Sequence, residues 1–377
     1  MEPTTHFLAG ACLARAGFNR KAAYATLAMT LAAETPDLDT LWSAAGPVAA
    51  FQHHRGITHT FLGLPFDGLV VLGVVWGIHR WRQRRAKSVP APKPGSATDQ
   101  PIERPLTAAP VRWGLLYGFI LIALLSHILL DWTNNYGVRP FFPFNPHWYA
   151  GSFVFIFEPF LWLILLVALV APALFGLIGS EVGARHQVFR GRGWAIFGLI
   201  AVVALWGWRK MEHDSAVQLA STATYGPEGS AGAEILRVTA SPHPGNPFRW
   251  HTVVETPTFY QIAAVDSRKG TVVTVPEQDL FYKPADTPAT LAAKQSWLGR
   301  VYLDWSAWPV VTDVGLSVPP GAPPDSPQWT TVSFRDLRFV YDTSLMNGRI
   351  NAPLSATVYV DAQGQVEQMQ MGSHVQH

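Results

Sequence analysis

Long apolar runs alternate with short polar segments over the first half of the chain. Three runs, at residues 57–78, 113–131 and 153–178, reach the roughly 20 residues that a helix needs to cross a bilayer. A fourth run, residues 194–208, is short at its apolar core but can be extended to that length. The pattern predicts an α-helical polytopic membrane domain with about four spans.

Two shorter apolar stretches come before these runs. Residues 7–16 and 22–33 are too short to cross a bilayer as straight helices, and a polar segment, residues 17–21, separates them. We expect a short N-terminal helical hairpin that either dips into the membrane or packs on the spanning helices.

The pattern changes after residue 210. Runs of β-forming residues recur between clusters of Pro and Gly, and one helical stretch, about residues 289–304, interrupts them. Residues 361–364 read as a hairpin turn. We predict a small β-rich soluble domain over residues 211–377, after a membrane domain over residues 1–210. The expected strands are residues 234–240, 250–255, 258–266, 271–275, 330–341 and 356–360.

The charge distribution supports this division and predicts an orientation. Charged residues make up only 14% of the chain, against about 25% in a typical soluble domain. Residues 80–112 and 179–193 are rich in Lys and Arg, while residues 132–152 hold only Arg139 and many aromatic side chains. Positive loops stay cytoplasmic. We therefore expect a multi-pass protein of the bacterial inner membrane with an extracytoplasmic C-terminal domain.

Composition also excludes several classes of protein. The single cysteine, Cys12, excludes an internal disulfide framework and a Cys-rich zinc site. The first residues lack the basic segment of a cleavable signal peptide, and none is expected. The C-terminal domain is acidic and no basic recognition motif is visible, so no direct nucleic-acid partner is expected. The sequence does not indicate an oligomeric state.

Several His and acidic side chains occur where a membrane chain normally avoids them. Imidazole and carboxylate together suit divalent ions such as Zn, Fe or Mn. His127 and Asp131 are four residues apart and share a helix face. The expected topology brings all the candidates to the outer membrane face, where we predict a divalent metal site with zinc as the first expectation. The candidate ligands are His6, Asp37, Asp39, His53, His54, His59, His127, Asp131 and Glu158.

A metal site of this kind, with one or two divalent ions, suggests hydrolysis. A bound ion lowers the pKa of water and polarises a phosphoryl or carbonyl oxygen. We expect Asp39 and His59 to take part in proton transfer, and Arg55 to clamp a phosphate. His147 in the aromatic loop is either a further ligand or an interface residue, and the second interpretation is favoured. Asp67 either lines a polar cavity or pairs with a helix neighbour.

Four motifs in this order resemble a known family: THFLAGACLARAGFNRKAA, AAETPDLD, HHRGITHT and SHILLDWTNNYGVRPFFPF. They are similar to those of inner-membrane-associated predicted metal-dependent hydrolases, described also as LexA-binding, over about residues 1–210. The resemblance implies the His and Asp ligand set given above. Such proteins often carry Asp-Pro after the aromatic loop, where this chain has Glu158-Pro159.

A second, shorter likeness concerns the substrate. The spacing of His127 and Asp131 resembles that in the zinc-dependent phospholipase C and nuclease group, which implies phosphoester substrates. A site at a membrane face implies membrane lipid as a partner.

Two other functions fit the same residues. The chain could be a non-enzymatic, metal-stabilised scaffold or regulator, with every coordination position filled by protein. It could also be a transporter with Asp67 and Glu158 as intramembrane relay groups. The small number of spans and the absence of a detectable repeat argue against a transporter.

Overall fold

The computed structural model contains two compact units. The first is formed by Met1–Leu38, Ile57–Tyr149 and Ile156–Gly207, and the second by Asp39–Gly56, Ala150–Phe155 and Trp208–His377. The domain boundary at residue 210 stays a prediction. The predicted cytoplasmic loops lie largely outside the described residues. Those residues are 1–88, 109–181, 191–227, 232–319, 323, 326–341 and 352–376.

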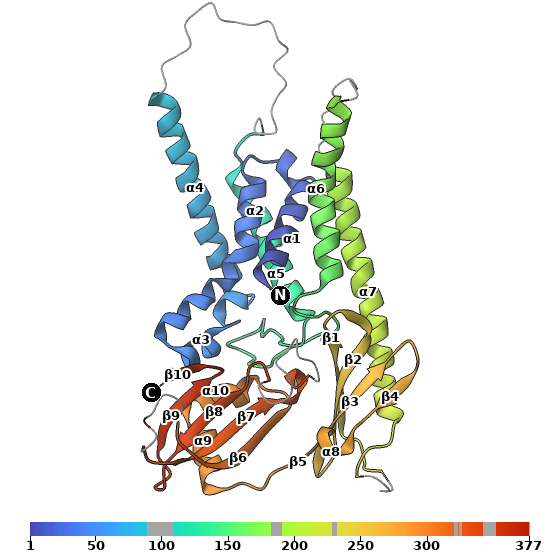
Figure 1. The fold of residues 1–377 in the computed structure, drawn as a ribbon. Helices are drawn as coiled ribbons and strands as arrows, with labels where there is room; N and C mark the ends of the chain where they lie inside the picture. The colour runs from blue at the N-terminus through green and yellow to red at the C-terminus, as the bar shows by residue number, and fades with distance from the viewer. Residues whose placement is uncertain are drawn as a thin grey trace, which may run out of the picture. The chain divides into compact units, whose positions relative to one another are not determined.

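Helices form the first unit. The expected N-terminal hairpin is present as α1 (Pro3–Arg15) and α2 (Ala25–Glu34), joined through the short η1 helix (Phe18–Arg20). α1 packs on α2, and α2 packs on α5 (Trp113–Trp132), so the three helices lie side by side (Figure 1). The other long helices are α4 (Leu64–Ser88), α6 (Pro159–Glu181) and α7 (Arg192–Thr222), of which α7 continues into the second unit.

Two helices among the described residues, α5 and α7, are long and apolar enough to cross a membrane. Pro47–His59 together with Leu64–Arg85 makes a third if this bent pair is one span. The described part of α6, Pro159–Phe175, is apolar but shorter. The expectation of about four spans is therefore confirmed only in part, as two to three candidate spans.

The first predicted run, residues 57–78, is not one continuous helix. Residues Ile57–His59 form the 3-10 helix η3, a turn follows, and α4 begins at Leu64. The Thr60 hydroxyl accepts a hydrogen bond from the Gly63 amide at 2.9 Å, and such side-chain bonds to the backbone compete with a helix. The break leaves His59 in a turn rather than inside a spanning helix.

Small residues set the distance between α1 and α2. A Cβ atom on Gly10 would lie 2.7 Å from the Ala33 Cβ and 2.8 Å from the Met29 carbonyl oxygen. Glycine at this point lets the two backbones approach closely, as in tightly packed membrane helices. Ala33 is one of the residues on which the site described below depends.

Replacing Gly10 by Ala should destabilise the first unit, because the added methyl group has no space. We expect a loss of about 1–3 kcal/mol, seen as a lower melting temperature of the detergent-purified protein. Gly118→Ala is the matched control, since a Cβ there meets nothing within 4 Å and Ala favours helix. An unchanged melting temperature for Gly10→Ala would contradict this packing.

The second unit contains two antiparallel five-stranded sheets (Figure 1). One has the order β1-β2-β3-β4, with β5 paired to β3, and the other has the order β10-β9-β8-β7-β6. The strands of the first sheet are Arg237–His243, Asn246–Glu255, Phe259–Asp266, Thr271–Val273 and Leu280–Tyr282. Those of the second, from β6 to β10, are Pro309–Ser317, Trp329–Asp336, Ala356–Val360, Val366–Met371 and His374–Gln376. The short helices are α3 (Pro47–His53), α8 (Pro276–Asp279), α9 (Pro288–Gln295) and α10 (Trp297–Trp305).

The predicted β-rich character is confirmed, with three differences. Strands β5, β9 and β10 were not predicted, because they are short or largely polar runs, and the longer strand β6 was also missed. The predicted strand over residues 330–341 ends at Asp336 and continues as a 3-10 helix. The single predicted helix is two helices, α9 and α10, because Ser296 is extended and caps the second through the Gly299 amide.

The two sheets share an apolar core. Val253 and Ile262 of the first sheet lie in one buried cluster with Val310 of the second. The buried Arg209 guanidinium donates to the Phe153 carbonyl at 3.1 Å. Arg209 therefore has a structural role in this unit.

Candidate metal centre

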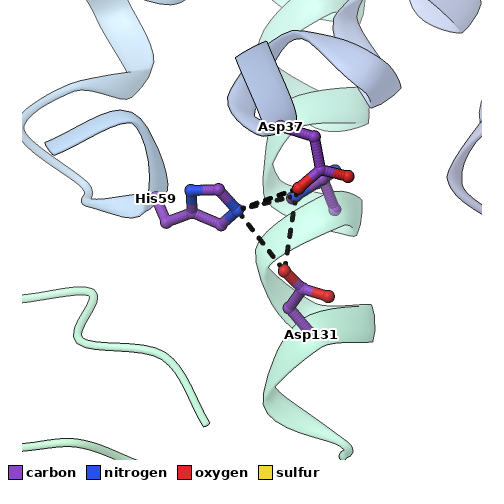
Figure 2. A group of neighbouring side chains, drawn as sticks. Asp37, His59 and Asp131 are labelled. Atoms are coloured by element: carbon purple, nitrogen blue, oxygen red, sulfur yellow. Dashed lines mark hydrogen bonds and ion pairs between the residues drawn. The ribbon is translucent and has the colours of Figure 1, made fainter. Parts of the chain in front are cut away.

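Four ligand-type side chains converge in the first unit: Asp37, His59, His127 and Asp131. Asp37 lies in η2 (Thr35–Ala45), directly after α2, and His59 ends η3. His127 and Asp131 lie one turn apart in α5. Figure 2 shows His59 pointing at Asp37 and Asp131 from the opposite side of the group. Segments far apart in sequence therefore meet at one point.

The donor atoms have the spacing of a coordination shell. His59 Nε2 lies 3.5 Å from Asp37 Oδ1 and 3.4 Å from Asp131 Oδ2. His127 Nε2 lies 3.6 Å from Asp37 Oδ1 and 3.5 Å from Asp131 Oδ2. The two histidine Nε2 atoms are 3.0 Å apart. Four donors ~2.1 Å from one ion at tetrahedral corners would lie ~3.4 Å from one another.

Burial strengthens this interpretation. The side chains of His59, His127 and Asp131 are fully buried, and that of Asp37 is only 15% exposed. Burial alone would raise the pKa of Asp37, but the neighbouring imidazole rings of His59, His127 and His6 outweigh it and hold the pKa well below its usual range. Two carboxylates this close repel each other unless a cation lies between them. The residues present therefore fit a divalent ion.

The Nδ1 atoms of His127 and His59 both contact neighbouring groups, and these contacts orient the Nε2 atoms toward the site. His127 Nδ1 lies 2.7 Å from the Ala33 carbonyl oxygen and must donate to it, because a carbonyl only accepts. This fixes the tautomer that leaves Nε2 available. His59 Nδ1 lies 3.1 Å from the Thr58 hydroxyl. Such partners orient metal-ligating histidines and tune their basicity.

Backbone contacts hold the turn that carries His59. The Phe61 amide donates to the Pro140 carbonyl at 2.8 Å, which ties the turn to the segment after α5. The Thr60 hydroxyl donates to the Ile57 carbonyl at 2.7 Å. A Cβ on Gly63 would lie 2.0 Å from the Ile57 oxygen, so this turn requires glycine.

His6 lies beside the group of four. Its ring stacks on that of His127, with centroids 3.7 Å apart. Its Nε2 atom lies 3.3 Å from Asp131 Oδ1, the carboxylate oxygen that faces away from His59 and His127. Burial, then the neighbouring His127 ring and the N-terminal amine, lower the pKa of His6 to about 3. The ring is therefore neutral at physiological pH, the form that binds metal.

Glu34 is a polar residue near the site that the sequence analysis missed. It ends α2, three residues before Asp37, and its Oε1 atom is buried without a hydrogen-bond partner in the described part of the chain. Burial, then the charges of Asp37 and Glu2, raise the pKa of Glu34 to about 7. Its place in the motif AAETPDLD, beside two predicted ligands, was the available signal.

The other predicted ligands of the HHRGITH and PDLD motifs belong to the second unit. Asp39 Oδ1 lies 3.2 Å from His54 Nδ1, and Asp39 Oδ2 accepts from the Arg55 amide at 2.6 Å. His53 stacks on Trp42. None of these side chains is in the metal-type group found among the described residues, and their predicted roles stay predictions.

Three further residues have separate positions. Glu158 is buried directly before α6, outside the group of four among the residues described. Asp67 lies in the first turn of α4, and its Oδ2 atom is buried without a hydrogen-bond partner in the described ranges. His147 lies in an exposed loop and packs against Tyr149.

A helical region with candidate membrane spans and a buried His/Asp group defines the class: a membrane protein with a possible metal site. The chain belongs to the YdjM inner membrane protein family, whose model matches residues 1–216. It is 22% identical over 177 residues to "Uncharacterized protein YfhP" of Bacillus subtilis (strain 168), a match that covers 45% of each protein. No solved structure matches the chain.

Removing one ligand should abolish metal binding at the group of four. We expect His59→Ala and Asp131→Asn to lose the ion, measured by inductively coupled plasma mass spectrometry on the purified full chain. Thr58→Val should weaken binding by about 10–100-fold, because it removes the partner of His59 Nδ1. His147→Ala, in the exposed loop, is the control that should bind as the wild type does. Full metal content in folded His59→Ala would contradict the assignment.

Proposed function

We propose that this protein is a membrane-bound hydrolase that uses a divalent ion, with zinc the expected one, to hydrolyse phosphoester groups of membrane lipid. The observation that carries the proposal is the buried set of Asp37, His59, His127 and Asp131 at coordination spacing. The family, one of predicted membrane hydrolases, supports it.

Residues around the ion have distinct tasks in this proposal. A divalent ion bound there would supply a water of lowered pKa and polarise a phosphoryl oxygen. The Ala33 carbonyl holds the His127 ring in place through its Nδ1 atom, and the Thr58 hydroxyl does the same for the His59 ring. We assign to Glu34 the role of proton acceptor, because burial and the charge of nearby Asp37 raise its pKa to about 7. The sequence-based roles of Asp39 in proton transfer and of Arg55 as a phosphate clamp remain part of the proposal.

Apolar side chains near the site favour a lipid substrate. Ile57 and Phe61, on the turn that carries His59, are about half exposed, and so is Phe141 after α5. Phe61 and Phe141 contact each other edge to face, with centroids 5.3 Å apart. Exposed apolar clusters of this kind mark membrane or ligand contact, which suits a substrate with acyl chains.

The same geometry also favours a second function. Four protein donors at tetrahedral spacing resemble a structural zinc site, because catalytic sites usually keep one position for water. A metal-stabilised scaffold or regulator would have such a closed site. The two functions differ in a measurable way, since only the hydrolase turns over a substrate.

The hydrolase should release phosphate or headgroup from vesicles of phosphatidic acid or phosphatidylglycerol, or cleave the soluble ester p-nitrophenyl phosphate. We expect release to require metal and to fall at least ~100-fold in His59→Ala, because the ion's transition-state stabilisation of several kcal/mol is lost. His147→Ala should keep the wild-type rate. A metal-loaded wild type no faster than His59→Ala on all three substrates would favour the closed, structural site.

We also propose that the site faces the outer side of the membrane and that the C-terminal domain is extracytoplasmic. The support is the concentration of Lys and Arg over residues 80–112, which begin in the last turns of α4, against the aromatic loop with only Arg139 after α5.

Cysteine labelling in intact cells tests this orientation. Phe144→Cys should react with a membrane-impermeant maleimide, and Gln83→Cys should react only after lysis. Both positions are exposed. The native Cys12 should not react with the maleimide, because it is fully buried and burial raises the pKa of its thiol to about 11. Labelling of Gln83→Cys before lysis would overturn the orientation.

A further inference from the structure

The two oxygens of Asp131 face different partners. Oδ2 lies 3.4 Å from His59 Nε2 and 3.5 Å from His127 Nε2, inside the group of four donors. Oδ1 lies 3.3 Å from His6 Nε2, on the other side of the carboxylate. A carboxylate in this position can serve two cations at once.

His6 needs an explanation that the four-donor site does not provide. Its side chain is fully buried, and neither ring nitrogen forms a hydrogen bond among the described residues. Leaving a buried polar group unpaired is unfavourable. The contact between His6 Nε2 and Asp131 Oδ1 does not have hydrogen-bond geometry. Its distance of 3.3 Å is, however, close to the ~3.4 Å expected between two donor atoms bound to one ion.

We propose that His6 Nε2 and Asp131 Oδ1 bind a second divalent ion, so that Asp131 bridges two ions. The ammonium group of Met1 pairs with the same oxygen, so the second ion would take the place of this ammonium at Oδ1. Ions of two-metal hydrolytic sites lie about 3.5–4 Å apart and clamp the attacking and leaving oxygens between them. This inference rests on the metal site of the proposed function, and it explains how a site with four protein donors could still hydrolyse an ester.

Metal stoichiometry tests the second ion directly. The full chain is purified in detergent, stripped with chelator, and dialysed against Zn²⁺ before metal and protein are quantified. We expect two ions per chain in the wild type and in His147→Ala, and one in His6→Ala. One ion in the wild type, or two in folded His6→Ala, would overturn the proposal.

A second variant separates metal binding from a positioning role of His6. His6→Gln keeps a side chain that can hydrogen-bond to Asp131 but removes the imidazole ligand. With Mn²⁺, the wild type should give the spin-coupled electron paramagnetic resonance spectrum of two neighbouring ions, and His6→Gln should give that of an isolated ion. An uncoupled wild-type spectrum at full loading would contradict the bridge.

The outcomes distinguish this inference from the proposed function. If the wild type binds one ion and His59→Ala binds none, the four-donor site stands and the second ion fails. If the wild type binds no ion, both fail. If it binds two ions but hydrolyses none of the tested esters, the second ion stands and the proposed reaction fails.

Discussion

Two carboxylates and two imidazoles buried together among apolar helices are the constraint on which the first unit depends. Asp37 and Asp131 approach the same pair of histidines at 3.4–3.6 Å, with almost no access to water. Burying ionised carboxylates without compensation is prohibitive, and neutral histidines do not cancel their charge. A divalent ion removes this cost, so ion binding and the packing of these helices should be linked.

Close helix packing makes the site possible. Gly10 lets α1 approach α2, and the end of α2 then carries both the Ala33 carbonyl, which orients His127, and the chain leading to Asp37. α1 also brings His6 against Asp131. A change in the packing of α1 or α2 should therefore shift the backbone that positions these ligands.

The sequence predicted the parts of this arrangement that depend on pattern. Apolar runs indicated the spanning helices, and the spacing of His127 and Asp131 placed both on one face. The sequence could not tell which of Asp37 and Asp39 is a metal ligand, because the direction of each side chain depends on how η2 turns. In the structure, Asp37 joins the ligand group, while Asp39 accepts a hydrogen bond from the Arg55 amide within the second unit. Likewise, the break after His59 depends on local hydrogen bonds of Thr60, and the polar strands β9 and β10 form by pairing with neighbours rather than from an apolar pattern.

The central claim is that one ion lies among Asp37, His59, His127 and Asp131. The most direct measurement is the anomalous difference density of a crystal of the metal-loaded protein at the absorption edge of the metal. The account predicts a peak about 2.0–2.2 Å from both Nε2 atoms and from one oxygen of each carboxylate. Metal-loaded crystals with the four side chains in this arrangement, but with no peak between them, would contradict it.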